Sequence, residues 1–226
     1  MKKTVLITGG NKGIGLELTK AFLELKYRVI VVARDFTNFA YKNEVECIEY
    51  DLTDVENIPK LVASMGKIDI LINNAGVMYS LPYDDYPQEK VNSMLKLNLE
   101  TPIKLIEECV KVGTTRIVNN ASVAAYTGHP DIWYGMTKSA LINATKSFAK
   151  IYEGKVILNA VAPSPVDTDM QKVNTPERKE AFKKSVITGR FATADEVAKT
   201  IVWLATESPE YINGTTVDIN NGSFMR

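Results

Sequence analysis

Short apolar segments alternate with longer segments of helical periodicity from one end of the chain to the other. Most of the short segments are continuously apolar, which is typical of strands that are covered on both faces. The predicted strands are Thr4–Thr8, Arg28–Ala33, Val45–Tyr50, Ile68–Asn73, Arg116–Ala121, Val156–Val161 and Thr216–Ile219. The predicted helices are Gly13–Leu25, Val55–Met65, a long helix within Gln88–Val112, Ile132–Tyr152, Pro176–Ser185 and Ala194–Thr206. This alternation predicts an α/β fold with a doubly wound, mostly parallel sheet of about seven strands and helices on both faces.

The chain has 226 residues, which is close to the upper size for one domain with a continuous core. It contains no internal repeat, no low-complexity tract and no linker that would divide it. We therefore predict a single Rossmann-type domain over residues 1–226. Only eleven residues, 34–44, separate the second and third predicted strands, whereas a parallel crossover normally takes a dozen or more. The helix at that edge of the sheet is expected to be very short or missing.

Charge and composition argue against several classes of partner. Lys plus Arg and Asp plus Glu number 27 each, so no overall field favours nucleic acid or an anionic membrane. The apolar run Val5–Ile7 is too short for a signal peptide, and no run approaches the roughly 18 apolar residues of a membrane span. Cys47 and Cys109 lie far apart and fit buried free thiols in a reducing cytoplasm. With His129 as the sole histidine, we expect neither a metal site nor a Ser-His-Asp triad.

A glycine-rich segment, Thr8–Gly15, follows the first predicted strand and opens the first predicted helix. Gly9, Gly13 and Gly15 allow a tight turn in which backbone N–H groups and the positive end of the helix dipole face a pyrophosphate. The spacing is GxxxGxG and not the usual dinucleotide pattern GxGxxG. Glycines alone also fit a merely flexible turn, but the position between strand and helix favours a dinucleotide-binding loop.

The residues that end the second predicted strand bear on the choice of cofactor. Where an acidic residue would accept the ribose 2′-OH of NAD, the chain reads Ala33-Arg34-Asp35. Arg34, together with Lys12, fits the 2′-phosphate of NADP through charge-assisted hydrogen bonds. Asp35 favours NAD if its side chain turns inward, and both cations also fit ordinary solvated charges. We predict NADP(H) as the favoured cofactor, with NAD(H) as the alternative.

Tyr134 and Lys138 lie near the start of a predicted helix, and their separation of four residues places both side chains on one face. A tyrosine has a pKa of about 10, and a lysine ammonium one turn away is expected to lower that pKa toward the range of a general acid/base. An exposed i,i+4 pair is the plain alternative. Ser122 lies twelve residues before Tyr134 at the carboxyl end of a predicted strand, where ligands bind in such sheets. Together the three residues predict catalysis at this edge.

Over essentially its whole length the sequence resembles the short-chain dehydrogenase/reductase family, and it is similar to 3-oxoacyl-acyl-carrier-protein reductase and carbonyl reductase-like members. The segments that carry the resemblance are TGGNKGIG at Thr8–Gly15, Asp51-Leu52, NNAG at Asn73–Gly76, Asn98, Ser122, YGMTK at Tyr134–Lys138 and NAVAP at Asn159–Pro163. The later stretches GRFATADEVAKTIVWLA and VDINNG also match.

The resemblance implies an NAD(P)(H)-dependent oxidoreductase that interconverts a carbonyl and a secondary alcohol. Tyr134 would be the general acid/base, Lys138 would lower its pKa and hold the nicotinamide ribose, and Ser122 would hydrogen-bond the substrate oxygen. Asn98 would position a water that leads protons from Lys138 to solvent. The hydride belongs to the cofactor.

The resemblance also implies a set of cofactor-binding residues. Asp51 would bind the adenine amino group, and Asn74, Ala75 and Gly76 would line the adenosine ribose. The full set is Gly9, Asn11, Lys12, Gly13, Ile14, Gly15, Arg34, Asp51, Leu52, Asn74, Ala75, Gly76, Tyr134, Lys138, Pro163, Val166 and Thr168.

Plain structural roles stand beside several of these assignments. Asp51 also fits a cap for the helix near Val55, in competition with Asp54, and Asn98 also fits a polar residue that bends its helix. Asn73 and Asn74 fit turn residues at a strand end. His129 fits a surface loop better than a substrate contact.

The sequence departs from the family pattern at three places. The interval from Ser122 to Tyr134 is twelve residues where thirteen are usual, so the loop between them is one residue shorter. Pro163-Ser164-Pro165 stands where the family has Pro-Gly, which makes that cofactor loop stiffer. The short 34–44 segment puts the adenosine-side contacts in doubt. None of these departures removes a catalytic group.

The favoured interpretation is an NADPH-dependent reductase of a small-molecule or acyl-thioester carbonyl. Its substrate lid is expected at residues 164–190, and its assembly as a homo-oligomer, dimer or tetramer. The alternative is a catalytically silent NAD(P)-binding sensor or scaffold on the same fold. A sugar-nucleotide epimerase is disfavoured because only about 64 residues follow Ala162, too few for its substrate domain.

Overall fold

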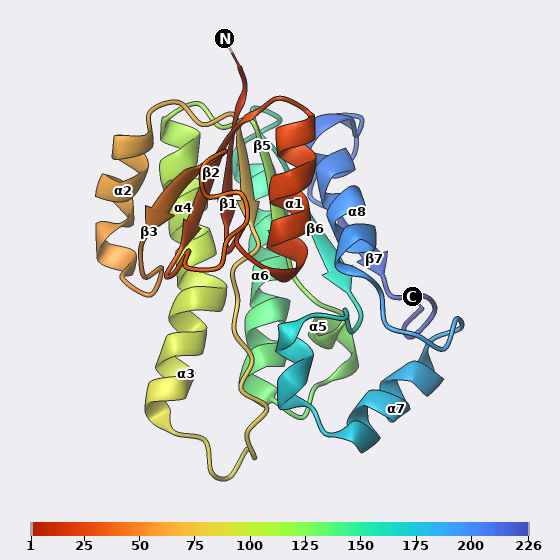
Figure 1. The fold of residues 1–226 in the computed structure, drawn as a ribbon. Coiled ribbons are helices and arrows are strands. Elements are labelled where there is room, and N and C mark those ends of the chain that lie inside the picture. Colours follow the sequence, from red (N-terminus) through yellow and green to blue (C-terminus); the bar gives the residue numbers. More distant parts are fainter. Residues whose placement is uncertain (1, 226) are drawn as a thin grey trace.

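The strands form one parallel sheet in the order β3-β2-β1-β4-β5-β6-β7 (Figure 1). The computed structural model describes residues 2–225. The strands are β1 Thr4–Thr8, β2 Arg28–Ala33, β3 Glu46–Glu49, β4 Ile70–Asn73, β5 Arg116–Asn120, β6 Ile157–Pro163 and β7 Thr216–Ile219. The predicted fold class, a doubly wound parallel sheet with helices on both faces, is confirmed.

The longer helices are α1 Gly13–Glu24, α2 Ile58–Met65, α3 Gln88–Leu95, α4 Thr101–Lys111, α6 Ile132–Ile151, α7 Pro176–Ser185 and α8 Ala194–Thr206. The short segments are η1 Val55–Asn57, α5 Ala124–Thr127 and η3 Asp169–Val173, and a π-helical turn, η2 Lys96–Glu100, joins α3 to α4. None of the helices between residues 2 and 225 combines the length and apolar character that a membrane span requires.

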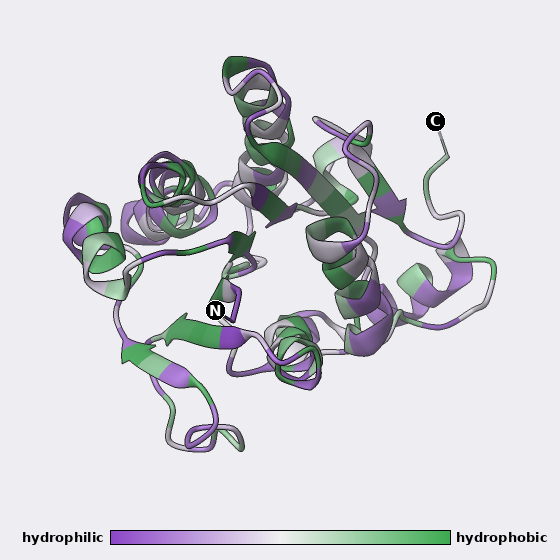
Figure 2. Cartoon of the chain, turned by 90° about the horizontal axis from the view of Figure 1, so that it is seen from above, coloured by the Kyte–Doolittle hydropathy of each residue, from purple (hydrophilic) through white to green (hydrophobic). Residues whose placement is uncertain are grey.

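The sheet separates two apolar cores because successive side chains of a strand point to opposite faces. In β1, Val5 and Ile7 pack with α1 and α8 on one face, whereas Leu6 packs with α2, α4 and α6 on the other. Figure 2 shows the strands predominantly hydrophobic and the helices two-toned, with helices on both sides of the sheet. Burial on both faces explains why the strands are continuously apolar in sequence.

The strand order reverses at β1, and this reversal defines where a ligand binds. From β1 the chain proceeds through β2 to β3 on one side, and then returns to place β4 on the other side. The loops that leave the carboxyl ends of β1 and β4 therefore diverge and leave a crevice between them. Thr8 ends β1 and Asn73 ends β4, so both conspicuous polar motifs of the sequence begin at this crevice.

Most predicted elements lie within two residues of the observed ones, and the differences have local causes. β4 begins at Ile70 and not at Ile68, and just before it the carboxylate of Asp69 accepts a hydrogen bond from Thr4 N–H (2.8 Å). The helix predicted within Gln88–Val112 changes to a π turn at Lys96–Glu100. The short segments α5 and η3 were not predicted.

Residues 34–44 contain no helix, as expected from their length. The segment is instead held by two aromatic side chains, Phe36 and Phe39, which are buried and pack with ring centroids 5.6 Å apart. They extend the core beyond the end of β2, next to the partly buried Tyr41. A hydrophobic anchor therefore takes the place of the crossover helix.

Candidate active site

The loop between β1 and α1 adopts a shape that requires glycine at two positions. Gly13 has a φ of +52°, in the left-handed region. At Gly15 a Cβ would lie 2.0 Å from the carbonyl oxygen of Gly9, so no side chain fits. The loop therefore folds tightly against the start of α1.

The N-terminus of α1 has no capping side chain. Lys12 occupies the N-cap position in an extended conformation, and the first backbone bond of the helix runs from Leu16 N–H to Lys12 O (3.2 Å). The N–H groups of Gly13, Ile14 and Gly15 consequently lack intrahelical acceptors. Such a helix end, facing the crevice, is suited to a phosphate group.

Asn74 joins the loops that follow β1 and β4. Its Nδ2 donates to Thr8 O (3.0 Å) and Gly9 O (3.2 Å), and its Oδ1 accepts from Asn120 Nδ2 (3.0 Å). Thr8 Oγ1 in turn accepts from the N–H groups of Asn74 and Ala75 (2.9 and 3.0 Å). The side chain of Asn74 is thus used to shape the crevice, and a ribose contact is left to the backbone of Asn74–Gly76.

Arg34 and Asp35 follow β2 and are exposed. Asp35 accepts from the N–H of Thr37 (2.8 Å) and from its hydroxyl, and these bonds lower the pKa of the Asp35 carboxyl. Its carbonyl accepts from Asn11 Nδ2 (2.8 Å), which ties the glycine loop to β2. Asp35 is therefore engaged in its own turn, whereas Arg34 is the exposed cation here.

Asp51 and Leu52 follow β3. Asp51 Oδ1 accepts from the N–H and hydroxyl of Thr53 (both 2.9 Å), so Asp51 closes a local turn. No side-chain cap is formed at the start of η1, where Asp54 stands. Leu52 is buried in the core beneath α2 and α4, so its side chain is not available to line an adenine pocket. The implied contact of Leu52 remains a prediction for its backbone only.

Tyr134, Ser122 and Lys138 come together at the carboxyl end of β5. The Ser122 hydroxyl lies near enough to the Tyr134 phenol to lower its pKa, and Ser122 Oγ accepts from Ala124 N–H (3.2 Å) at the start of α5. Lys138 Nζ donates to Asn120 O (2.8 Å) and lies 5.7 Å from the centroid of the Tyr134 ring. Tyr134 and Lys138 are both buried, so the exposed-pair alternative is wrong.

Burial controls the protonation of this cluster. Burial raises the pKa of Tyr134, and the nearby Ser122 hydroxyl lowers it only in part. Burial also lowers the pKa of Lys138 to about 8. The expectation that Lys138 lowers the pKa of Tyr134 stays a prediction. Tyr134 is held as the neutral phenol, which is the form that donates a proton.

Asn98 lies in the π turn and is completely buried. Its Oδ1 accepts from Val77 N–H (2.8 Å), and its Nδ2 donates to Val77 O (2.9 Å) and Thr137 Oγ1 (3.3 Å). A Cβ at Gly76 would lie 3.3 Å from Asn98 Oδ1 and 3.5 Å from Lys138 Nζ. Asn98 thus borders the lysine across Gly76, and both of its proposed roles, bending the helix and serving the lysine, are compatible with this position.

The loop after β6 closes the crevice from the other side. Pro163 ends β6, and Val166 forms an isolated parallel bridge with Ala192. Thr168 approaches the glycine loop, since a Cβ on Gly13 would lie 3.3 Å from its Cγ2. The loop after β6 therefore meets the start of α1.

Comparison with known proteins decides the family. The family model described as enoyl-(acyl carrier protein) reductase matches residues 9–223. The chain is 31% identical to 3-oxoacyl-acyl-carrier-protein reductase FabG of Aquifex aeolicus (strain VF5), over 98% of this chain and 97% of the relative. This chain belongs to the short-chain dehydrogenase/reductase family.

Other relatives of this short-chain dehydrogenase/reductase carry different names at similar identity. It is 31% identical to galactitol 2-dehydrogenase of Agrobacterium fabrum, over 99% of this chain and 98% of the relative. The solved structure of ElxO with NADP bound has 31% identity and a TM-score of 0.87, with 99% of each chain covered. These relatives are reductases and dehydrogenases, and the chain is accordingly an oxidoreductase of the NAD(P)-dependent class.

The crevice of this short-chain dehydrogenase/reductase fits a nicotinamide dinucleotide on its own geometry. The free N–H groups of α1 suit the pyrophosphate, and Gly76 leaves open the space beside Lys138. Asn120 adds a buried acceptor without a partner, its Oδ1. The orientation of the Asn120 amide follows from its neighbour. Asn74 Nδ2 donates to two carbonyl groups, so Asn74 Oδ1 faces Asn120 and must accept from Asn120 Nδ2, which leaves Asn120 Oδ1 as the unpaired atom.

Two residues of this short-chain dehydrogenase/reductase site were missed by sequence reasoning. Asn120 supplies the carbonyl that holds Lys138, which no side-chain pattern signals. Asp131 is buried and caps α6 by accepting from Tyr134 N–H (3.1 Å). An aspartate directly before the predicted helix start was a recognisable N-cap signal.

Proposed function

We propose that this chain is an NADPH-preferring carbonyl reductase in which Tyr134 protonates the oxygen of a ketone or 3-oxoacyl thioester. The observation that carries the proposal is that Ser122, Tyr134 and Lys138 come together at the carboxyl end of β5, with Tyr134 and Lys138 both buried. The cofactor supplies the hydride when bound.

Each catalytic side chain has a distinct task in this mechanism. The Ser122 hydroxyl donates a hydrogen bond to the carbonyl oxygen and stabilises the negative charge that develops there. The neutral Tyr134 phenol transfers its proton to that oxygen. Lys138 Nζ, held by Asn120 O, lies near enough to stabilise the phenolate left after transfer. Asn98 is proposed to pass protons from solvent toward Lys138.

The cofactor set of the sequence analysis is retained in the proposal, with Arg34 as the main determinant of NADP. Lys12 is within electrostatic range of Asp169, whereas Arg34 is within range of Asp51 on the adenosine side. Asp35 is turned onto Thr37 and does not compete for the ribose. ElxO, whose structure contains NADP, is a relative with the same fold.

The proposal extends to the organisation of the chain. Residues 1–226 act as one domain, with the 164–190 segment as the substrate lid over Tyr134. The enzyme works in the cytoplasm as a homo-oligomer, dimer or tetramer, and needs no membrane, nucleic acid or metal. FabG of Aquifex aeolicus is named a reductase and aligns with this chain over nearly its full length. This similarity supports reduction as the direction of the reaction.

Replacement of Tyr134 by Phe tests the proposed function. Tyr134→Phe removes the transferred proton and keeps the ring, so turnover should fall by at least about 100-fold, the usual contribution of general acid catalysis. NADPH binding, followed by fluorescence titration, should change by less than about threefold. Near-normal turnover in the variant would remove Tyr134 from its role. An unmodified enzyme that binds NADPH but reduces no ketone or thioester would favour the silent sensor instead.

A further inference from the structure

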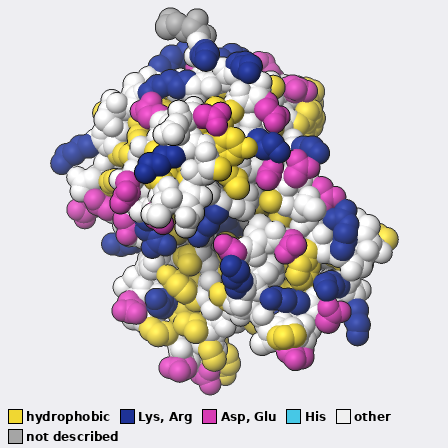
Figure 3. All heavy atoms as spheres, in the orientation of Figure 1, with side chains coloured by type: hydrophobic (Ala, Val, Ile, Leu, Met, Phe, Trp, Pro, Cys, Tyr) yellow, Lys and Arg dark blue, Asp and Glu magenta, His cyan; other side chains and the backbone are white. Residues whose placement is uncertain are grey.

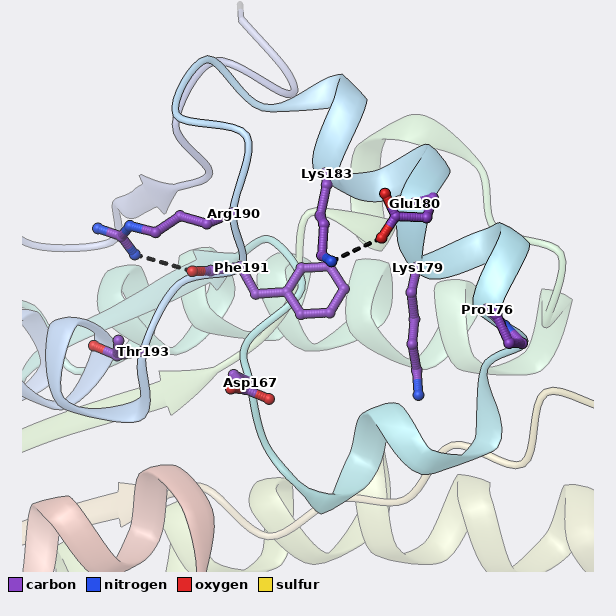
Figure 4. Close-up of a pocket in the computed structure, with 8 residues that line it drawn as sticks. All are labelled: Asp167, Pro176, Lys179, Glu180, Lys183, Arg190, Phe191 and Thr193. Atoms are coloured by element: carbon purple, nitrogen blue, oxygen red, sulfur yellow. Dashed lines mark hydrogen bonds and ion pairs between the residues drawn. The ribbon is translucent and has the colours of Figure 1, made fainter.

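The lid helix α7 has two faces with different surroundings. Pro176, Lys179, Glu180 and Lys183 recur at one-turn spacing and line a cavity of about 580 Å³ that Phe191 and Arg190 border (Figure 4). Arg178 lies on the other side of the helix, together with Phe182. The two faces therefore meet different side chains.

The charges on the cavity face are largely compensated within the protein. Lys183 pairs with Glu180 (2.7 Å; Figure 4). Arg190 pairs with Glu196 (2.7 Å). Lys179 extends into the open part of the cavity and is free to remain solvated. The abundance of lysine in the lid, taken alone, consequently selects no ligand. Over the face shown in Figure 3, basic and acidic side chains are likewise interspersed.

Arg178 is the exception. Its Nη2 lies 2.8 Å from His129 Nε2, and its guanidinium lies 5.3 Å from the centroid of the Phe182 ring. Because a guanidinium can only donate, His129 Nε2 must accept, and His129 is neutral. Burial and the charge of Arg178 both lower the pKa of His129, in agreement with that state. Within residues 2–225 no carboxylate forms an ion pair with Arg178.

The nearest acidic group is already occupied. The buried carboxylate of Asp131 accepts from the N–H groups of Tyr79, Ser80 and Tyr134 and from the hydroxyl of Tyr86, at 2.9 to 3.3 Å. These donors use its lone pairs, so Asp131 acts on Arg178 only through space. Arg178 is thus a half-buried cation whose remaining N–H groups have no ion-pair acceptor among residues 2–225.

Arg178 is also close to the reacting group. The ring of His129 lies 5.3 Å, centroid to centroid, from the ring of Tyr134. One imidazole therefore separates the guanidinium from the proposed proton donor. A desolvated cation is costly unless an anion pairs with it, and the planar fork of arginine matches a carboxylate.

We propose that Arg178 binds the carboxylate of the substrate, which makes the preferred substrate an oxo acid whose ketone oxygen lies at Tyr134 and Ser122. The inference rests on the proposed function and narrows its substrate. Hydride from NADPH adds to the carbonyl carbon, the Tyr134 proton adds to the oxygen, and the products are a hydroxy acid and NADP⁺. The carboxylate is unchanged and only positions the substrate.

The experiment compares oxo acids with their methyl esters. NADPH oxidation is measured with 3-oxobutanoate, 4-oxopentanoate and 5-oxohexanoate and with the corresponding esters, in the unmodified enzyme and in Arg178→Met. At least one acid should have a kcat/KM well above that of its ester. In Arg178→Met, KM for that acid should rise about 10- to 100-fold with little change in kcat, as expected for loss of a charged hydrogen bond. Ester reduction should change by less than about twofold.

Two further variants make the outcome decisive. Lys184→Met removes an exposed cation from the same helix and should leave the acid-to-ester ratio unchanged. Arg178→Lys keeps the charge without the fork and should recover only part of the acid preference. Equal kcat/KM for acids and esters in the unmodified enzyme, or an unaltered ratio in Arg178→Met, would overturn the assignment of Arg178. Loss of reduction for acids and esters alike would count against the proposed function instead.

Discussion

Lys138 shows how strongly the position of one residue controls its chemistry. Its ammonium is buried and donates to a main-chain carbonyl, that of Asn120. A carbonyl compensates less of the lost hydration than a carboxylate would, so the pKa falls to about 8. The unfolded lysine, near 10.5, binds more protons than the folded one between these two values. The stability of the native state therefore rises with pH across that window.

Comparison of the unmodified protein with Lys138→Met tests this linkage. The variant lacks the titrating group, so its stability has no such contribution. The free energy of unfolding of the unmodified protein should increase, relative to the variant, by up to roughly 3 kcal/mol from pH 8 to pH 10.5. Urea unfolding at several pH values measures the difference. The same difference taken against Lys184→Met should stay flat, and a flat profile for Lys138→Met would contradict a depressed pKa.

At the scale of elements, a helix or strand can be predicted from sequence where the interactions that determine it are local. β1, β2, β7, α7 and α8 match their predicted bounds because hydrophobic pattern and capping residues decide them. The π turn at Asn98 could not be predicted from sequence. Asn98 is held there by hydrogen bonds to Val77, which lies 21 residues earlier in the chain. The grouping of Ser122, Tyr134 and Lys138 followed from motif and spacing. Arg178 did not, because its importance comes from His129, 49 residues away.

The N-terminus of α8 gives a test at this scale. Thr193 and Glu196 form a capping box, in which Thr193 Oγ1 accepts from Glu196 N–H (3.2 Å) and Glu196 accepts from Thr193 N–H (2.8 Å). Thr193→Ala should lower the free energy of unfolding by about 1 kcal/mol, measured by urea denaturation. Thr200→Ala, at a partly exposed position of the same helix, is the matched control and should be neutral or stabilising. Equal effects of the two variants would show that the box contributes nothing.

At the scale of the whole molecule, a dinucleotide in the crevice joins the loops after β1, β4 and β6 and should stabilise the fold. At a free concentration of 100 times its Kd, NADPH should raise the free energy of unfolding by about 2.7 kcal/mol. For a chain of this size that corresponds to a rise in Tm of roughly 5–10 °C, measured by calorimetry.

The choice of cofactor can be measured in the same way. At equal concentrations NADH should raise Tm less than NADPH, and Arg34→Gln should remove most of that difference. Lys42→Gln, which removes another cation from the 34–44 segment, should preserve it. A larger effect of NADH in the unmodified protein would assign NAD as the cofactor.

The strand order has a further consequence for co-translational folding. The first strand to be made, β1, becomes the centre of the sheet, and its partners β2 and β4 end only at Ala33 and Asn73. At about 5–20 residues per second, synthesis up to β4 takes several seconds. During that time β1 has at most one of its two sheet neighbours. The hydrogen bonds of Asn74 with Thr8 and Asn120 require β5, so the crevice can form only after residue 120 has been made.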